Sequence, residues 1–259
     1  MVRSAGLAHS DAMFQEASPA FLLVCLIFFG AGVVKGVLGM GLPTVAIGLL
    51  GLVMPVASAA SLLTLPSLVT NAWQTVSGGG LARTARRLWP MQLGIAVGVA
   101  LAAPLFPDLQ ESSGRRVLGA CLAAYGVVGL MGWQPKQPGG TWDKPLALLT
   151  GITTGLITGV TGVFVLPAVL YLQSLDLRKQ EMAQALGLSF TTSTLALGLL
   201  LAIQGHLTMR SSLDSAVVII PALLGMAAGQ IVRGAMSEAL VRRCFFIGVL
   251  LLGGWLLAH

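Results

Sequence analysis

Hydrophobic and polar positions separate on the scale of whole segments in this chain, with long apolar runs divided by short polar ones. Uncharged apolar runs of about 18 residues or more are candidate membrane spans. Five elements are predicted in each half: residues 19–38, 44–53, 57–77, 88–106 and 115–133, then 145–162, 163–174, 182–204, 215–232 and 243–258. The second element of each half is short. The pattern predicts an all-α polytopic membrane protein with eight to ten membrane segments and a broken or re-entrant helix pair in each half.

The composition agrees with this class. Hydrophobic residues make up 56% of the chain and charged residues 9%, whereas an ordinary soluble domain carries about 25% charge. A net charge of +6 could indicate nucleic-acid binding, but the basic residues lie in short loops and are not interleaved with aromatics. The three cysteines stand alone in apolar runs, without metal-ligand spacing. We therefore expect no nucleic-acid partner, no metal and no cofactor.

Two glycine-rich interruptions break these runs at corresponding places, at residues 32–43 (GVVKGVLGMGLP) and 155–167 (GLITGVTGVFVLP). Paired interruptions of hydrophobic segments in two halves of a membrane protein indicate a transporter's binding site. Three glycines of the first interruption recur 123 positions later in the second, and its proline recurs after one inserted residue: Gly32, Gly36, Gly39 and Pro43 against Gly155, Gly159, Gly162 and Pro167.

A second echo supports an internal duplication. Four residues recur at a constant spacing of 131 positions: Pro90, Leu93, Gly94 and Gly98 against Pro221, Leu224, Gly225 and Gly229. Self-similarity in the same order in both halves is the sequence signature of a repeat. Because each half has an odd number of elements, the second half enters from the opposite side. We interpret residues 1–133 and 145–259 as inverted repeats, joined by a linker at residues 134–144 within one membrane domain.

The distribution of basic residues predicts the orientation, since inner loops are enriched in Lys and Arg. With both termini outside, ten basic residues face inward: Arg83, Arg86, Arg87, Lys136, Lys144, Arg178, Lys179, Arg233, Arg242 and Arg243. Four face outward: Arg3, Arg115, Arg116 and Arg210.

Each interruption implies an internal cavity, because non-helical backbone survives at membrane depth only where protein buries it or water lines it. Pro43 suits the first turn of a new helix, where its missing N–H costs nothing. The N-terminus of that helix would attract an anion, and the segment ending at Pro167 offers the same arrangement. The alternative is that the upstream glycines pack helices together, since they have GxxxG spacing.

Lys35 is the only charged residue in the first three elements. A lysine inside a membrane span is costly, by about 2.5–3.5 kcal/mol or more, and marks a functional site by default. The alternative is that its side chain reaches the membrane surface. Because Lys35 lies between two motif glycines, we favour a cation that attracts an anion.

The third element carries polar residues at three- and four-residue steps, which places them on one helix face: Ser61, Thr64, Ser67, Asn71 and Gln74. Its counterpart in the second half carries Ser189, Thr191, Thr192, Ser193 and Thr194. Such a face turns inward, toward a substrate path or toward interhelical hydrogen bonds. Ser and Thr can also bond their own helix backbone, so we give Asn71 and Gln74 more weight.

At the paired glycine–proline interruptions the chain resembles the sulfite exporter TauE/SafE family of anion permeases, over nearly its whole length. Gly36, Gly39, Gly41 and Pro43 match the first family motif, and Gly159, Gly162 and Pro167 match the second. The resemblance implies secondary transport of a small sulfur-containing anion, such as sulfite, thiosulfate or an organosulfonate, across the bacterial cytoplasmic membrane.

We therefore expect a transporter that works by alternating access, with the anion and the lipid bilayer as partners and a homodimer as the alternative to a monomer. A passive anion channel of the same architecture is an alternative. A membrane-embedded enzyme is disfavoured because the chain has no HExxH motif and no intramembrane pair of Asp residues. The expected substrate-binding residues are Lys35, Gly36, Gly39, Met40, Gly41, Pro43, Asn71, Gln74, Gly159, Thr161, Gly162, Pro167, Thr191, Thr192 and Thr194.

Overall fold

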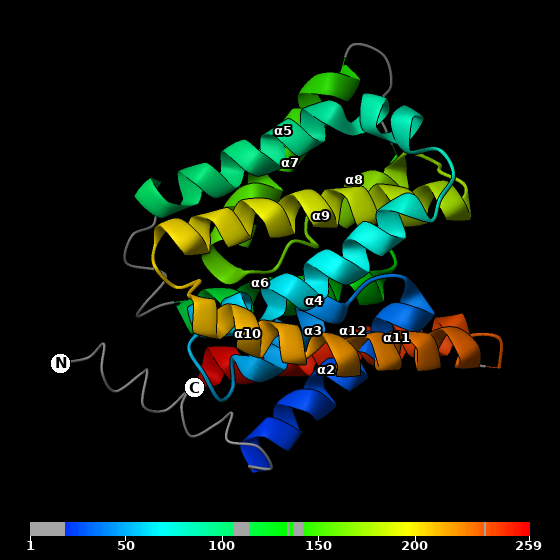
Figure 1. The fold of residues 1–259 in the computed structure, drawn as a ribbon. Helices are drawn as coiled ribbons and strands as arrows, with labels where there is room; N and C mark the ends of the chain where they lie inside the picture. Colours follow the sequence, from blue (N-terminus) through cyan, green and yellow to red (C-terminus); the bar gives the residue numbers. More distant parts are fainter. Residues whose placement is uncertain (1–18, 106–113, 134, 137–141, 236) are drawn as a thin grey trace.

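The computed structural model describes residues 19–105, 114–133, 135–136, 142–235 and 237–259, and this part of the chain is helical without any strand (Figure 1). The all-α class predicted from the sequence is confirmed. The helices are α2 (Pro19–Leu38), α3 (Leu42–Leu50), α4 (Val56–Val76), α5 (Leu81–Leu105), α6 (Gly114–Met131), α7 (Asp143–Thr161), α8 (Ala168–Ser174), α9 (Lys179–Ile203), α10 (Met209–Val217), α11 (Ile219–Val232) and α12 (Glu238–Ala258).

Most predicted elements are present, but several helices begin earlier than their apolar runs. Helix α5 begins at Leu81, so Arg83, Arg86 and Arg87 lie on its first turns and not in a loop. The starts of α9, α10 and α12 differ in the same direction. Hydropathy marks only the stretch suited to hydrocarbon, whereas the helix continues until glycine or a cap ends it. The predicted linker is also shorter, since Asp143 and Lys144 belong to α7, and its residues 134 and 137–141 lie outside the described residues.

Six segments are long and apolar enough to cross a membrane: Pro19–Leu38, Leu81–Leu105, Gly114–Met131, Lys179–Ile203, Met209–Val232 and Ala239–Ala258. Helices α3 and α8 have nine and seven residues. At about 1.5 Å per residue each is less than half the thickness of the bilayer core, about 30 Å. The short elements predicted after each interruption are therefore confirmed as short.

Helices α4 and α7 are long enough to span but less apolar than these six. Their polar side chains are buried inside the protein: Ser61, Thr64, Ser67, Thr70, Asn71 and Thr75 on α4, and Thr150, Thr154, Thr158 and Thr161 on α7. In lipid such groups must find partners within the protein. The polar faces of α4 and α7 thus turn toward the interior.

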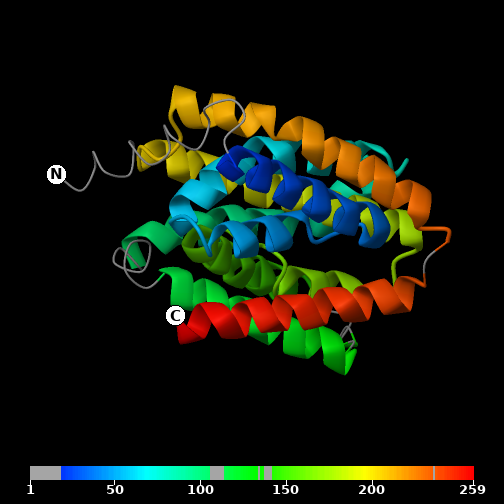
Figure 2. The same ribbon diagram turned by 90° about the horizontal axis from the view of Figure 1, so that it is seen from below.

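Helices from the two halves pack against one another in a reciprocal pattern (Figures 1 and 2). Helix α2, the first helix of the first half, packs on α11, whereas α7, the first of the second half, packs on α5. The third helices of the two halves, α4 and α9, pack together, and so do the last, α6 and α12. An inverted duplication predicts this exchange, and we keep two repeats as our interpretation of the chain.

Glycines allow two of these helix pairs to approach closely. A Cβ added at Gly36 would lie 2.9 Å from the Cα of Gly229 on α11, and one added at Gly98 would lie 2.9 Å from the Cα of Gly155 on α7. Close approach of backbones at small residues is a common way of packing helices in membranes. The two sets of glycines recognised as repeats are thus each other's packing partners.

The predicted inward loops share one end of the bundle. Arg87 Nη2 on α5 donates a hydrogen bond to the carbonyl oxygen of Leu175, just before α9 (3.4 Å). At the opposite end of α4, Ser61 Oγ donates to the carbonyl oxygen of His206 (3.2 Å), and Ser215 Oγ to that of Leu62 (2.7 Å). The basic residues near positions 83–87 and 178–179 therefore lie at the same end, as the orientation prediction requires.

Candidate functional site

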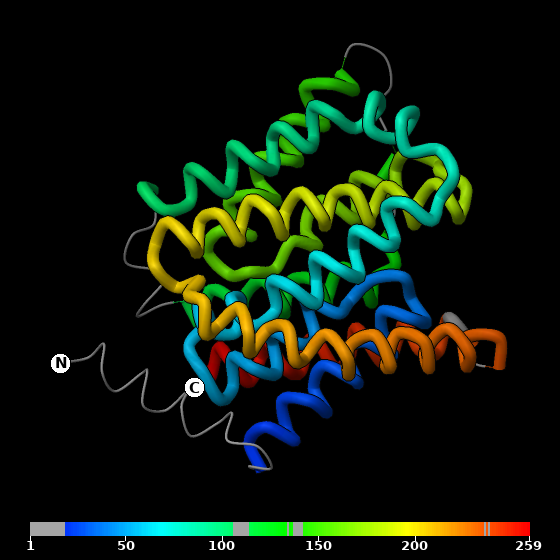
Figure 3. Tube along the Cα trace, in the orientation of Figure 1, coloured from blue at the N-terminus to red at the C-terminus, as the bar shows by residue number. Residues whose placement is uncertain are grey.

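The first interruption separates α2 from α3 by three residues, and two of them are glycines in the left-handed region, Gly39 (φ 74°) and Gly41 (φ 105°). Other L-residues adopt this conformation at a cost of about 1–2 kcal/mol. Gly41 caps α3 at its N-terminus, and Pro43 lies in the first turn of that helix. The position predicted for Pro43 is confirmed. Figure 3 traces the chain through this interruption.

The second interruption is longer and has a different geometry. Helix α7 ends at Thr161, Gly162 follows with φ 71°, and Thr161 Oγ1 accepts a hydrogen bond from the backbone N–H of Val163 (3.1 Å). Pro167 precedes α8 after a cis peptide bond. Pro167 is therefore the residue before the helix and does not lie in its first turn, in contrast to Pro43. The residues between Gly162 and Pro167 extend the chain before the helix can begin.

The two halves meet at these interruptions. A Cβ placed on Gly162 would lie 2.3 Å from Cδ1 of Ile47, which belongs to α3 after the first interruption. Gly162 and Ile47 are both buried. The backbone at Gly162 thus packs directly on the short helix of the other half.

Lys35 is buried, with only 3% of its surface exposed, although it lies close to the end of α2. Its Nζ donates hydrogen bonds to Thr70 Oγ1 (3.1 Å) and to Asn71 Oδ1, both on α4. Asn71 Nδ2 in turn donates to Thr194 Oγ1 on α9 (3.4 Å). The structure therefore joins three predicted residues, Lys35, Asn71 and Thr194, in one cluster across α2, α4 and α9, and adds Thr70.

A second set of polar contacts lies one turn further along α4. Gln74 Nε2 donates to the carbonyl oxygen of Gly39 in the first interruption (2.8 Å). The hydroxyls of Thr75 and Thr191 lie 3.2 Å apart, linking α4 to α9. Thr70 and Thr75 were not among the predicted residues. Thr70 follows Ser67 by three positions and Thr75 follows Asn71 by four, so the helical spacing itself was the signal that could have found them.

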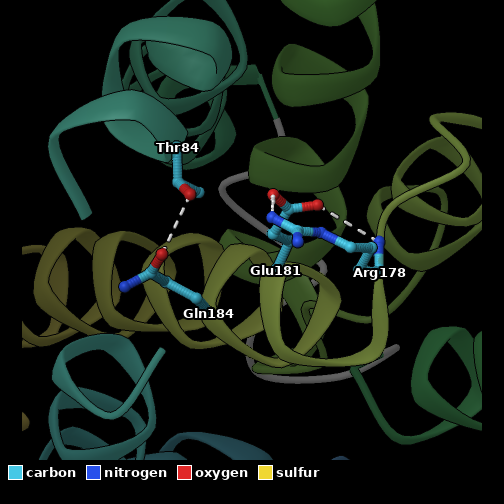
Figure 4. Close-up of polar contacts among 4 residues, drawn as sticks. All are labelled: Thr84, Arg178, Glu181 and Gln184. Carbon is cyan, nitrogen blue, oxygen red and sulfur yellow. Dashed lines mark hydrogen bonds and ion pairs between the residues drawn. The ribbon is translucent and has the colours of Figure 1, made fainter. Parts of the chain in front are cut away.

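The lysine cluster contains no carboxylate. Among the described residues Lys35 is the only charged side chain that is buried, and the only ion pair joins Arg178 to Glu181 (2.8 Å). Figure 4 shows that pair at the start of α9, where Arg178 is 79% exposed. An ammonium group has three donors, and the oxygens of Thr70 and Asn71 accept two hydrogen bonds. The cluster is thus a buried cationic site with neutral ligands.

Two further hydroxyls are buried beside this cluster. Ser67 Oγ and Ser193 Oγ have no hydrogen-bond partner among the described residues. Ser67 lies one helical turn before Asn71, and Ser193 is the neighbour of Thr194. Because buried polar groups normally have a partner, these hydroxyls are available as neutral donors.

The remaining predicted residues have other surroundings. Gly36 lies in the α2–α11 contact, and Gly159 faces Ala102 of α5, where a Cβ would come within 2.3 Å of the Ala102 Cβ. Met40 is buried, and its sulfur accepts a hydrogen bond from Tyr125 Oη (3.7 Å). Thr192 Oγ1 donates to the carbonyl oxygen of Leu188 in its own helix (3.1 Å).

These features define a multi-pass α-helical membrane protein with a cationic polar cluster buried between its halves. The sequence pattern of the sulfite exporter TauE/SafE family matches residues 24–256, so the chain belongs to this family of membrane transporters for sulfur-containing anions. The resemblance noted from the glycine–proline interruptions is confirmed. No curated protein and no solved structure matches the chain.

Proposed function

We propose that this protein is a secondary transporter of a small sulfur-containing oxyanion, such as sulfite, thiosulfate or an organosulfonate, and that the anion binds beside Lys35. The observation that supports this most directly is the burial of Lys35 among neutral oxygens without a carboxylate. A substrate anion would supply the missing negative charge.

The energetics favour such a ligand. Burying an unpaired charge costs several kcal/mol, and an opposite charge about 4 Å away contributes about 4 kcal/mol at an effective dielectric constant of 20. The hydroxyls of Ser67, Thr70 and Thr194 lie on or beside the cluster and can donate to oxyanion oxygens. Family membership supports the sulfur chemistry of the ligand, and the lysine cluster supports its charge.

Alternating access fits the position of the cluster. Thr70 and Asn71 belong to the first half, and Thr194 belongs to the second. In transporters built from repeats, one repeat moves relative to the other around a site near the middle of the membrane. Relative motion of α4 and α9 would change the contacts between Asn71 and Thr194 and between Thr75 and Thr191. We propose that these contacts differ between the outward- and inward-open states.

The first test is a thermal-shift panel on the purified protein in detergent with sulfite, thiosulfate, sulfate, sulfoacetate, taurine and chloride. A ligand that binds the folded state raises the melting temperature in a saturable way. We expect a shift with at least one sulfur oxyanion and its loss in Lys35→Met. The matched control is Lys179→Met, which removes the same charge from an exposed position on α9.

Uptake into proteoliposomes separates a transporter from a passive channel of the same architecture. A carrier gives a flux that saturates with anion concentration and is reduced in Lys35→Met but not in Lys179→Met. Flux that rises linearly with concentration would favour the channel. Absence of both a thermal shift and a flux with every sulfur anion would overturn the proposed function.

A further inference from the structure

We infer that the substrate binds as a monoanion, so that the site selects a singly charged sulfur oxyanion, such as a sulfonate or hydrogen sulfite, over a dianion of similar shape. This inference rests on the proposed function and specifies the charge of its substrate. The argument is a count of the charges that surround Lys35.

The helices that build the cluster supply one cation and no other charge near it. Lys35 is the only charged residue of α2, and neither α3 nor α4 contains any. On α9 the last charged residue is Glu181. Thr194 follows it by thirteen positions, which corresponds to about 20 Å along the helix axis. Helix α11, which packs on α2, also has none.

Every other polar group at the cluster is neutral. Thr70 and Asn71 accept hydrogen bonds from Lys35, and Thr194 accepts one from Asn71. The buried hydroxyls of Ser67 and Ser193 add donors without adding charge. Hydroxyl and amide groups can solvate the oxygens of an anion, but they cannot neutralise a second full negative charge.

The second half does not repeat the cation. The position equivalent to Lys35, 123 residues later in the register of the interruptions, is Thr158. Thr158 is fully buried, and its hydroxyl donates to the carbonyl oxygen of Thr154 (2.7 Å). A site between two equivalent halves could hold two cations and match a dianion. This one holds a single cation, so a dianion would keep one unpaired charge in a buried place.

The test compares two tetrahedral anions of similar size but different charge, methanesulfonate with one negative charge and sulfate with two. Dissociation constants are measured by calorimetry on the full chain in nanodiscs, with sulfite and thiosulfate as reference ligands. We expect methanesulfonate to bind at least tenfold more tightly than sulfate. Sulfate binding equal to or tighter than methanesulfonate would overturn the inference and leave the proposed function standing. No binding of any of the four anions would overturn the proposed function itself.

A charge substitution at Asn71 gives an independent arm. Asn71→Asp keeps the size of the side chain but places a carboxylate on Lys35, which brings the net charge of the cluster to zero. We expect at least a tenfold loss of methanesulfonate affinity, whereas the neutral variant Asn71→Ser loses less. The melting temperature of each unliganded variant shows whether it is folded. Equal affinity in folded Asn71→Asp and Asn71→Ser would contradict the inference, because the charge of the cluster would then not decide binding.

Discussion

Gly36 of α2 and Gly229 of α11 meet backbone to backbone, with 2.9 Å between the Cα of Gly229 and the place where a Cβ on Gly36 would stand. The neighbour of Gly36 in the chain is Lys35, the cation of the buried cluster. The contact therefore fixes the end of α2 against the second half of the molecule, and so helps to hold Lys35 beside α4.

This contact predicts a stability difference between two glycines of the same helix. At Gly36 a methyl group would lie 2.3 Å from the carbonyl oxygen of Met226, whereas at Gly30 nothing lies within 4 Å. We expect Gly36→Ala to lower the free energy of unfolding by about 1–3 kcal/mol, as overpacking does. Gly30→Ala should be neutral or slightly stabilising, because Ala has the higher helix propensity. The measurement is thermal unfolding in detergent, and equal melting temperatures for the two variants would contradict the close contact.

Gly162 at the second interruption gives a similar comparison between two glycines with positive φ. Gly162→Ala adds backbone strain and also a contact with Ile47 Cδ1, whereas Gly205 has φ 75° and open space around it. Both substitutions cost about 1–2 kcal/mol in strain, and we expect Gly162→Ala to cost a further 1 kcal/mol or about that from overpacking. Thermal unfolding measures the difference. Ile47→Val removes the contacting methyl group, so it should restore part of the loss in the double variant, and no restoration would argue against the packing described.

Much of the fold and part of the candidate site follow from the sequence, because burial in a membrane requires apolar runs and leaves polar residues conspicuous. The bounds of α2 agree with the predicted element at residues 19–38. Lys35 and Asn71 were singled out as polar groups that a membrane tolerates only with partners, and they are each other's partners. Thr70 was missed because a threonine can bond its own helix backbone, and it does so with Pro66 while also accepting from Lys35.

The pairing of helices could not be read from the chain alone. GxxxG spacing shows that a helix can approach another closely, but it does not name the partner. The first echo, at Gly36 and Gly155, and the second, at Gly98 and Gly229, were recognised only as repeats. Their contact follows from the three-dimensional exchange of helices between the halves. The later position of Pro167 relative to its helix likewise depends on the path of residues 163–166.

The orientation of the bundle is open to a labelling test. The turn between α4 and α5 contains the exposed Ser77, and Met209 is exposed at the start of α10. In a background with the native cysteines replaced, single variants Ser77→Cys and Met209→Cys are treated in intact cells with a maleimide that does not cross membranes. The distribution of basic residues predicts labelling of Met209→Cys in intact cells and of Ser77→Cys only after lysis. The reverse pattern would place both termini on the inner side.

Gln184 joins α9 to the end of α4 and to α5, and its side chain is fully buried. Its Nε2 donates to the carbonyl oxygen of Thr75 (2.9 Å), and its Oε1 accepts from Thr84 Oγ1 (3.0 Å; Figure 4). Gln184→Leu would leave both partners unpaired in a buried place, so we expect a loss of about 1–3 kcal/mol in the free energy of unfolding. The control is Gln180→Leu, at an exposed position one turn earlier in the same helix.

A double-mutant cycle with Thr84→Val isolates the hydrogen bond between the two side chains. Because the single variants remove the same bond, the double variant should be less destabilised than the sum of the two, by about 0.5–1.5 kcal/mol. The lost contacts also lie at the end of the bundle that carries Arg87, between the lysine cluster and the predicted inner surface. We therefore expect Gln184→Leu to increase labelling of Ser77→Cys in inside-out vesicles relative to Gln180→Leu. Equal labelling and strictly additive energies would show that Gln184 does not hold α4, α5 and α9 together at this end.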